Sequence, residues 1–351
     1  MIKKLTATGL VVEYNPFHNG HIHHIQETKK ITDNNVLIAI MSPHFVQRGE
    51  PAFIDKWSRT KAALDKGIDI VIELPTYYAL QSADYFASAA IQLLSLMKVS
   101  DLVYGVENLD LVVPTFNKEA FESGASYAAS FEHDLASPNN NLALAYEKAI
   151  ANSEIRTHRI QRTNSYNSLE IDTKIASASE NRHAHKEGHT TQHTSPMTFK
   201  TTFDLSEYES IIKYAIASQS TDELKNYLLV DEGIEHLIKK HFHKPLDDFI
   251  NACTSSRYTH SRITRTLMNI ILKNRKDTPA SLEQVRILGF TNKGQEYLKQ
   301  CKKDDVPMTP SFRNYVNKDL ELLATTVYSL VKDQKIQDQL RQDEISNLIR
   351  K

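Results

Sequence analysis

The sequence predicts an α/β protein in which a doubly wound parallel sheet is followed by a mainly α-helical domain. In the first third of the 351 residues, short β-branched and apolar runs alternate with helical patterns. Continuous apolar strands that alternate with helices are typical of a parallel sheet covered on both faces. From Phe203 onward the patterns are mostly helical, with little strand character. These two observations determine the expected fold class.

The expected strands are apolar runs bounded by turn residues. They span Thr6–Tyr14, Asn35–Met41, Ile68–Leu74, Asp101–Tyr104 and Thr157–Gln161. Helical periodicity lies between or beside them, over His21–Lys30, Lys56–Lys66, Ala83–Met97 and Ala143–Ala151. The later helices are expected over Glu207–Ser218, Thr221–Val230, Glu232–Phe242, Leu246–Cys253 and Tyr258–Lys273.

A polar, histidine-rich stretch at residues 181–195 separates the two parts. Its composition predicts a loop or flexible linker, so we place one domain over residues 1–195 and a second over residues 196–351. A metal site is the alternative, because the stretch contains His183, His185, His189 and His193. The polar, low-complexity surroundings favour the linker.

The composition indicates a globular protein with an ordinary core, at 40% hydrophobic and 24% charged residues. No apolar run approaches the roughly 20 residues that cross a bilayer, and the basic start of the chain leads into a strand, not a signal peptide. The cysteines are Cys253 and Cys301 alone, which argues against a secreted disulfide scaffold. We therefore expect a cytoplasmic protein with no membrane partner.

A pair of histidines, His18 and His21, follows the first expected strand and opens a helix. Pro16 biases the preceding residue away from helical angles, and Gly20 allows the backbone to pass close to a ligand. Free amide groups at a helix start favour an anion, and nucleotides bind at this edge of a parallel sheet. Imidazoles can stabilise the charge that develops in nucleotidyl transfer. The segment therefore predicts a nucleotide triphosphate site.

Two other interpretations of this segment are open. The histidines can cap a turn without binding a ligand, although the strand–turn–helix context favours a site. A metal could use His21, His23 and His24, but neighbouring histidines on a helix point in different directions. We predict no metal site here.

These residues resemble the HIGH-motif nucleotidyltransferase superfamily. The string Gly9–His21 (GLVVEYNPFHNGH) narrows the resemblance to the bacterial tRNA(Met) cytidine acetate ligase family. Further similar blocks are Phe45–Ala52, Ile70–Pro75, Tyr104–Gly105, Ser137–Asn140, Ile175–Ser177, Arg257–Thr259 and Arg262–Arg265. The matches are dense in the N-terminal part and thinner in the C-terminal half.

The resemblance implies a HIGH-type fold and a two-step reaction. Family members use ATP and acetate to form acetyl-adenylate and pyrophosphate. They then transfer the acetyl group to N4 of the wobble cytidine of elongator tRNA(Met). Mg²⁺ is expected on the triphosphate, held mainly by phosphates and water. The implied ATP contacts are Val11, Val12, Glu13, Tyr14, Asn15, Pro16, Phe17, His18, Asn19, Gly20, His21, Ile22, His23, His24, Gly105, Asn140 and Arg162.

Three positions depart from the family pattern. Pro43 stands in a block that is otherwise Ser-Gly-Asn, Ala143 replaces a glycine, and Glu180 lies beside the phosphate-facing arginine of its block. These departures bear on rate and ATP affinity more than on the fold.

In this scheme His18 and His21 stabilise the charge on the α-phosphate as acetate attacks, and Arg48 is a candidate helper. A guanidinium fits phosphate with two parallel hydrogen bonds. The alternative for Arg48 is a surface turn in which it pairs with Glu50.

Three more charged residues have two interpretations each. Lys56 and Arg59 lie three residues apart on one helical face, which is either solvated or part of the site. Glu73 ends a strand, where it either orients a substrate amine or serves as a helix cap or an ion partner of Lys56 or Arg59.

The stretch from Arg257 to Lys276 contains basic residues and no acidic one before Asp277. An apolar stripe that includes Ile263 and Leu267 would leave the basic side chains on the other face, where they could contact RNA phosphates. Tyr258 could stack on an unpaired base. A solvated basic face is the alternative. With the family resemblance, the expected tRNA contacts are Arg257, Tyr258, Arg262, Arg265 and Lys273.

The sequence thus predicts an ATP-dependent acetate ligase that acts on tRNA. One alternative is an adenylyltransferase for a small phosphorylated metabolite, which would leave the basic stretch without a role. Another is a non-catalytic RNA-binding relative, in line with the departures from the motif. The oligomeric state is left open.

Overall fold

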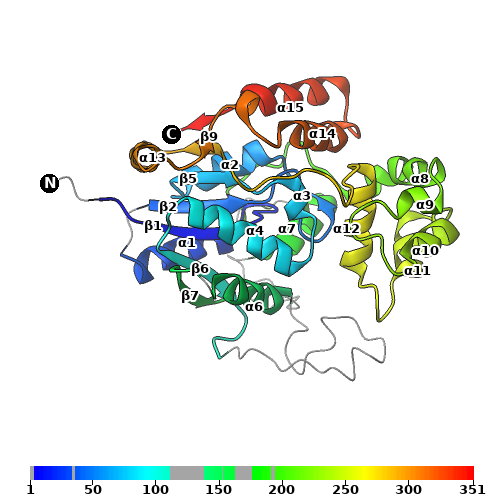
Figure 1. Ribbon diagram of the computed structural model, residues 1–351, viewed down its shortest axis with the longest axis horizontal. Coiled ribbons are helices and arrows are strands. Elements are labelled where there is room, and N and C mark those ends of the chain that lie inside the picture. Colours follow the sequence, from blue (N-terminus) through cyan, green and yellow to red (C-terminus); the bar gives the residue numbers. More distant parts are fainter. Residues whose placement is uncertain are drawn as a thin grey trace.

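A computed structural model describes residues 4–33, 36–110, 138–151, 153–162, 176–189, 191 and 194–351. Its centre is a mixed sheet with strand order β10-β8-β5-β2-β1-β6-β7, and β9 pairs with β8 (Figure 1). The strands are β1 Ala7–Val12, β2 Val36–Met41, β5 Ile70–Glu73, β6 Asp101–Val106, β7 Arg156–Gln161, β8 Val285–Phe290, β9 Met308–Thr309 and β10 Ile349–Arg350. The five N-terminal strands of this sheet are parallel, as predicted, whereas β8 runs antiparallel to β5.

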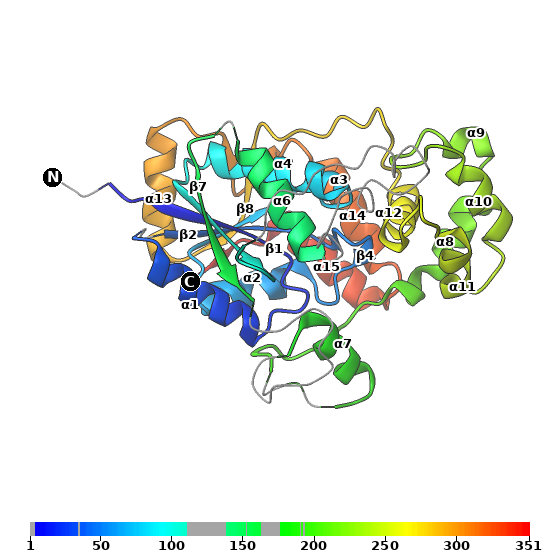
Figure 2. The ribbon, with the colours of Figure 1, turned by 90° about the horizontal axis from the view of Figure 1, so that it is seen from below.

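Both faces of β2 are buried, so its side chains alternate between two separate cores. Ile38 and Ile40 pack in a cluster with α4 (Ala83–Leu96) and α6 (Pro138–Ile150). On the opposite face, Leu37, Ala39 and Met41 pack in a cluster with residues of α1 (Asn19–Ile31) and α2 (Lys56–Asp65). Figure 2 shows these helix pairs on the two sides of the sheet. The doubly wound arrangement is therefore confirmed.

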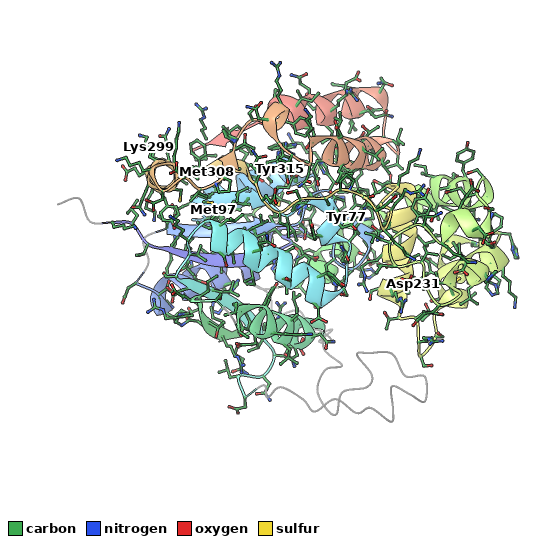
Figure 3. The ribbon with its side chains drawn as sticks, viewed as in Figure 1. Tyr77, Met97, Asp231, Lys299, Met308 and Tyr315 are labelled. Carbon is green, nitrogen blue, oxygen red and sulfur yellow. The ribbon has the colours of Figure 1, made fainter. Side chains whose placement is uncertain are left out.

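A group of helices, α8–α12, packs beside the carboxyl edge of the sheet (Figure 1). We call residues 209–271 the helical layer. Its helices are α8 Glu209–Ala217, α9 Thr221–Leu224, α10 Ile234–His241, α11 Leu246–Cys253 and α12 His260–Ile271. They enclose a third core cluster, which also takes in Phe45 and Leu80 of the N-terminal part. Tyr77, in the short helix α3 (Thr76–Ala79), lies between the sheet and this layer, to which Asp231 belongs (Figure 3).

After the helical layer the chain returns to the sheet. β8 pairs with β5, and β10 pairs with β8. The last helices are α13 Asn292–Lys303, α14 Lys318–Ser329 and α15 Gln334–Ser346. This arrangement differs from the expected division at residue 195, because residues from 285 onward complete the sheet of the N-terminal part. The apolar run of β8 indicated this last part of the sheet, but it lies among mostly helical patterns and was not recognised as a strand.

The expected linker at residues 181–195 is wrong for the part that the structure describes. Residues 178–186 form helix α7, which begins with a capping box between Ser177 and Glu180. Beyond the helix, the Thr194 hydroxyl donates to Asn181 at 2.7 Å, and both residues are buried. The Ser-x-x-Glu spacing was the overlooked helix signal. His193 lies outside the described residues.

Candidate active site

A pocket of about 280 Å³ opens at the carboxyl ends of β1 and β6. The N-terminus of α1 forms one wall, and the hairpin of β3 (Phe45–Val46) and β4 (Glu50–Pro51) forms another. α6 and the start of α7 complete it, so segments far apart in the sequence meet there. We call this cavity the main pocket.

The two motif histidines cap the first turn of α1. His18 is the N-cap residue, and its Nδ1 accepts the backbone N–H of Gly20 at 3.1 Å. The backbone N–H of His18 in turn donates to Nδ1 of His21 at 3.2 Å. An imidazole nitrogen that accepts a hydrogen bond carries no proton, so each neutral ring carries its proton on Nε2. The expected capping role is thus present, and it leaves two N–H donors on residues that line the main pocket.

Burial keeps these rings neutral. It lowers the pKa of His18 to about 3, helped by the positive charges of Arg162 and Arg182. It also holds the pKa of His21 well below its usual range, and lowers that of His24 to about 4. At neutral pH the turn therefore presents hydrogen-bond donors without full positive charge.

Distant segments hold the turn in place. Asn15 accepts the backbone N–H of Phe53 through its side-chain oxygen, at 2.6 Å. The Ser195 hydroxyl donates to the Phe17 carbonyl at 2.7 Å. Asn19 donates its N–H to the Thr194 carbonyl at 2.9 Å. The histidine-rich stretch thus forms part of the site's framework.

Three arginines line the main pocket, namely Arg48, Arg162 and Arg182. Burial lowers the pKa of the Arg162 guanidinium; the charge of Glu107 opposes this shift, and the charge of Arg48 adds to it. Gly105 lies against Arg162, since a Cβ at that position would be 3.2 Å from Cγ of the arginine. Several guanidiniums around one cavity favour a ligand with several negative charges.

Arg182 was not among the expected ATP contacts, although it stands in the third block that departs from the family pattern. It lies in α7, where one Nη donates to the Asn15 carbonyl at 2.7 Å and the other to the Ser179 hydroxyl at 3.2 Å. The capping box that starts α7 could have placed it at the pocket. Glu180 caps this helix through the N–H of Ser177.

The expected ATP contacts divide into two groups. Those that line the main pocket are Val11, Val12, Glu13, Tyr14, Asn15, His18, Gly20, His21, His23, His24, Gly105 and Arg162. Those outside its lining are Pro16, Phe17, Asn19, Ile22 and Asn140. Asn140 is buried, and its oxygen accepts the N–H of Glu107 at 3.2 Å, whereas the neighbouring Asn139 faces the pocket. Ala143 packs in the core behind it.

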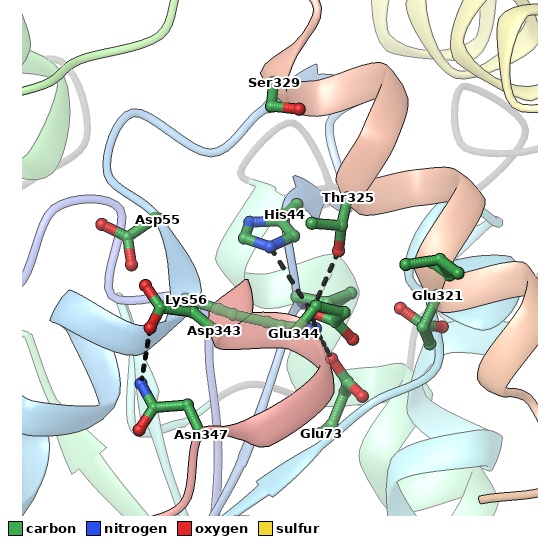
Figure 4. A network of polar contacts seen from close by, with 12 residues as sticks. His44, Asp55, Lys56, Glu73, Glu321, Thr325, Ser329, Asp343, Glu344 and Asn347 are labelled. Atoms are coloured by element: carbon green, nitrogen blue, oxygen red, sulfur yellow. Dashed lines mark hydrogen bonds and ion pairs between the residues drawn. The ribbon is translucent and has the colours of Figure 1, made fainter. Parts of the chain in front are cut away.

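Lys56, Arg59 and Glu73 lie outside the main pocket and are buried. Lys56 forms ion pairs with Glu73 and Glu344 (Figure 4). Arg286 forms ion pairs with the same two carboxylates. Of the interpretations of Glu73, the ion partner of Lys56 fits. Lys56 and Arg59 are buried and outside the main pocket, so neither the solvated face nor a place in the pocket lining fits them.

Arg59 holds the backbone next to the main pocket by donating hydrogen bonds to carbonyl groups. Its guanidinium donates to the Glu13 carbonyl at 2.6 Å, to the Ser42 carbonyl at 2.9 Å and to the Pro43 carbonyl. The departure at Pro43 keeps the carbonyl that this arginine uses.

The expected tRNA contacts lie in and around α12, but not on one open basic face. Tyr258 is only 6% exposed, and its hydroxyl donates to the Glu232 carbonyl at 2.6 Å. The Arg262 guanidinium stacks on the Tyr258 ring, 5.2 Å from its centroid. Glu232 is also within 3.5 Å of Arg257 and 3.6 Å of Arg262. An acidic residue from an earlier segment of the chain therefore neutralises part of the basic stretch.

Arg265 is buried, contrary to the expected basic face. All residues of α12 from Ile263 to Ile271 are buried, because the helix packs between the hairpin and the rest of the helical layer. The Nη1 group of Arg265 donates to the Gln47 carbonyl at 3.2 Å. Lys273, just beyond the helix, is exposed.

In the part of the chain that the structure describes, no helix is long and apolar enough to cross a membrane. The same residues include no group of three histidine, cysteine or carboxylate side chains placed to hold a metal ion.

Comparison with known proteins identifies the family. The HIGH Nucleotidyl Transferase family matches residues 5–343. The tRNA(Met) cytidine acetate ligase of Leuconostoc citreum is 41% identical over 339 residues, covering 85% of each chain. That of Oceanobacillus iheyensis is 34% identical and covers 98% of this chain and 100% of its own.

A solved structure, Thermotoga maritima TmcAL bound with alpha-thio ATP, shares the fold, with a TM-score of 0.85 at 24% identity. It covers 99% of this chain and 100% of the Thermotoga chain. This protein therefore belongs to the HIGH nucleotidyl transferase family and, within it, to the tRNA(Met) cytidine acetate ligases.

Proposed function

We propose that this protein is an ATP- and acetate-dependent ligase that acetylates N4 of a cytidine in tRNA, the wobble cytidine of elongator tRNA(Met). The observation that carries the proposal is the pair of Nε2–H donors of His18 and His21 at a helix N-terminus, in a pocket lined by three arginines. Relatives that match this chain over most of their length are named for this activity.

The first step forms acetyl-adenylate. An acetate oxygen attacks the α-phosphorus of ATP, a P–O bond forms, and the bond to the bridging oxygen breaks as pyrophosphate leaves. Negative charge builds on the α-phosphate oxygens in this step, and His18 and His21 would donate to them. Because their donors are fixed before the reaction, no reorganisation is required as the charge develops. Arg48, Arg162 and Arg182 would bind the triphosphate.

The second step transfers the acetyl group. The N4 amine of cytidine attacks the carbonyl carbon of acetyl-adenylate, a C–N bond forms, and AMP leaves with the electron pair of the broken C–O bond. The amine loses one proton to solvent or to a pocket base. Single-stranded anticodon bases can be turned out of the stack, which suits delivery of a base into a pocket.

Mg²⁺ would accompany the triphosphate. Among the described residues, the carboxylates that line the main pocket are Glu13 and Glu50. So small a set of acidic side chains fits a cation held mostly by phosphates and water. The metal would neutralise charge on the phosphates.

The RNA would lie across the helical layer, with Arg257 and Lys273 as the exposed cations of the expected set. Both residues follow the core-forming helices and face solvent, where a phosphate can reach them. Arg262, which is partly exposed, would be a further contact, whereas Arg265 is buried.

An ATP–pyrophosphate exchange assay with varied acetate separates the candidate functions. A tRNA acetate ligase exchanges label only when acetate is present. An adenylyltransferase for a phosphorylated metabolite exchanges label without acetate and requires that metabolite. A non-catalytic RNA-binding relative exchanges none under either condition, which would contradict the proposal.

A further inference from the structure

Arg48 sits at the tip of a hairpin that reaches the main pocket. β3 and β4 pair antiparallel, with Phe45 opposite Pro51 and Val46 opposite Glu50. The N–H of Gly49 donates to the Val46 carbonyl at 2.9 Å and closes the turn. Because the turn has only three residues, the position of the Arg48 side chain depends on what holds the backbone around it.

The base of this hairpin belongs to the third core cluster. Phe45 is fully buried in the third core cluster, with its ring 6.4 Å from that of Tyr208 and 5.9 Å from that of Tyr328. The Tyr328 hydroxyl donates to the carbonyl of Ala52, directly after β4, at 2.7 Å. The hairpin is therefore packed as part of the helical core while its tip lines the nucleotide pocket.

Two consecutive residues of α12 hold the tip itself. The Thr264 hydroxyl donates to the Arg48 carbonyl at 2.6 Å, and the Arg265 guanidinium donates to the Gln47 carbonyl at 3.2 Å. Gly49 has φ +82°, and a Cβ there would be 2.2 Å from the backbone nitrogen of Arg265. Only glycine allows α12 to come this close to the turn.

The other side of the turn is fixed to the sheet. The N–H of Gln47 donates to Glu13, at the end of β1, at 2.8 Å, and its side chain donates to the Gln81 carbonyl at 3.2 Å. The turn thus lies between β1 and α12, and its backbone has bonds on both sides.

Arg265 is a costly group for a merely structural contact. It is 9% exposed, burial lowers its pKa to about 10, and its Nε has no hydrogen-bond partner among the residues that the structure describes. A buried guanidinium that bonds a backbone carbonyl stabilises a fold less than an apolar side chain would. What it provides is a fixed position for the carbonyl beside Arg48.

We propose that Thr264 and Arg265 are positioning residues that aim Arg48 at the phosphates of ATP, so that the adenylation step depends on the helical layer. The inference rests on the proposed function. It assigns to Arg265 a role in the first chemical step in place of a contact with tRNA.

The matched pair Thr264→Val and Thr266→Val tests this inference. Both threonines are buried on the same helix, but the Thr266 hydroxyl donates to the Arg262 carbonyl within α12, at 2.8 Å. Valine removes one hydroxyl in each case and keeps the shape. We expect Thr264→Val to lower kcat of acetate-dependent exchange about 10- to 100-fold, the range that small misplacements of a catalytic group produce. KM for ATP should change less than about twofold, and Thr266→Val and the rescue variant Thr264→Ser should retain most of the activity.

A double-mutant cycle with Arg48→Ala separates positioning from general damage. If Thr264 acts through Arg48, Thr264→Val has no further effect on exchange in the Arg48→Ala background. Equal losses in both valine variants, or an undiminished loss in the Arg48→Ala background, would overturn the inference. If Thr264→Val lowers Tm more than Thr266→Val does, the double-mutant cycle with Arg48→Ala is repeated with Arg265→Met in place of Thr264→Val. Absence of acetate-dependent exchange in the unaltered protein would instead overturn the proposed function, and the positioning role with it.

Discussion

The backbone N–H of His18 donates to Nδ1 of His21, and this bond fixes the proton of the His21 ring on Nε2. The two rings lie with centroids 3.8 Å apart, and His18 has the same protonation because its own Nδ1 accepts from Gly20. The same two imidazole rings therefore cap the helix through Nδ1 and provide the proposed donors through Nε2. The same bonds that begin α1 set the tautomers that the chemistry requires.

Replacing His21 should remove a donor to the α-phosphate. We expect His21→Ala and His21→Asn each to reduce acetate-dependent exchange about 10²–10³-fold, the usual cost of one preorganised donor. Asn is the sharper variant, because its side-chain oxygen can still accept the N–H of His18. Circular dichroism and Tm show whether each variant is folded. Near-normal exchange in a folded His21→Asn protein would show that Nε2 is not the donor.

The buried histidines should make the protein less stable in acid. In the unfolded chain they titrate near 6.5, whereas the pKa is about 3 for His18 and about 4 for His24 in the folded protein. The unfolded state therefore binds more protons between these values, so stability falls as pH decreases from about 6.5 toward 3. The measurement is urea unfolding across this pH range.

His24→Gln should flatten that pH dependence, because its buried ring no longer takes up a proton on unfolding. The exposed His243→Gln serves as the control and should leave the slope unchanged. Equal slopes for the unaltered protein and His24→Gln would mean that the ring binds its proton at the same pH in the folded and unfolded states.

Charge reversal at Arg257 and Lys273 should weaken tRNA binding and leave acetate-dependent exchange almost intact. Adenylate formation needs only ATP and acetate, whereas acetyl transfer needs the RNA held in register. The dependence of log affinity on log salt should become shallower by about one for each phosphate that the variant no longer binds. Binding at several salt concentrations, with exchange in parallel, tests this. An unchanged affinity and slope would place the RNA surface elsewhere.

The buried ion pairs of Lys56 and Arg286 with Glu73 and Glu344 form a network in which each charge depends on its partners for stability. Arg286 lies between Glu73 and Glu344, and Lys56 bonds the same carboxylates. Burial would raise the pKa of Glu344, but these two cations hold it below its usual value. We expect Arg286→Leu to lower the free energy of unfolding by about 3–5 kcal/mol, because it leaves buried negative charge short of a partner.

Arg341→Leu is the matched control for the network, since Arg341 lies exposed on α15 near Glu344. It should change the unfolding free energy by less than about 0.5 kcal/mol. Similar losses in the two variants, measured by urea denaturation, would contradict the stabilising role of the network.

The parallel strands and the histidine turn could be predicted because their signals are local. β2 is an uninterrupted apolar run, and the His18–His21 spacing follows a strand directly. Periodicity and motif context are sufficient for such elements. The main features of the N-terminal sheet followed from them.

The remaining features depend on pairings between distant residues. Arg286 of β8 donates a hydrogen bond to Glu73 of β5, and the two residues are 213 positions apart in the sequence. The neutralising Glu232 lies 25 residues before Arg257 in sequence but beside it in space. Periodicity reports which face of a helix is apolar. Residues Ile263–Ile271 of α12 are nevertheless buried on every side, because the hairpin covers the face that Arg265 occupies. Such burial is set by tertiary packing, which a single sequence window does not contain.

The proposed joining of acetate to tRNA cytidine at the expense of ATP can be measured directly. The protein is incubated with ATP, labelled acetate and tRNA(Met), after which the RNA is digested and its nucleosides are separated. We expect label in N4-acetylcytidine, with one AMP released per acetyl group, and none when ATP is omitted. When His21 is replaced by Asn, labelling should be about 10²–10³-fold slower. Labelled acetate that never enters the nucleoside fraction, while acetate-dependent exchange proceeds, would contradict tRNA cytidine as the acceptor.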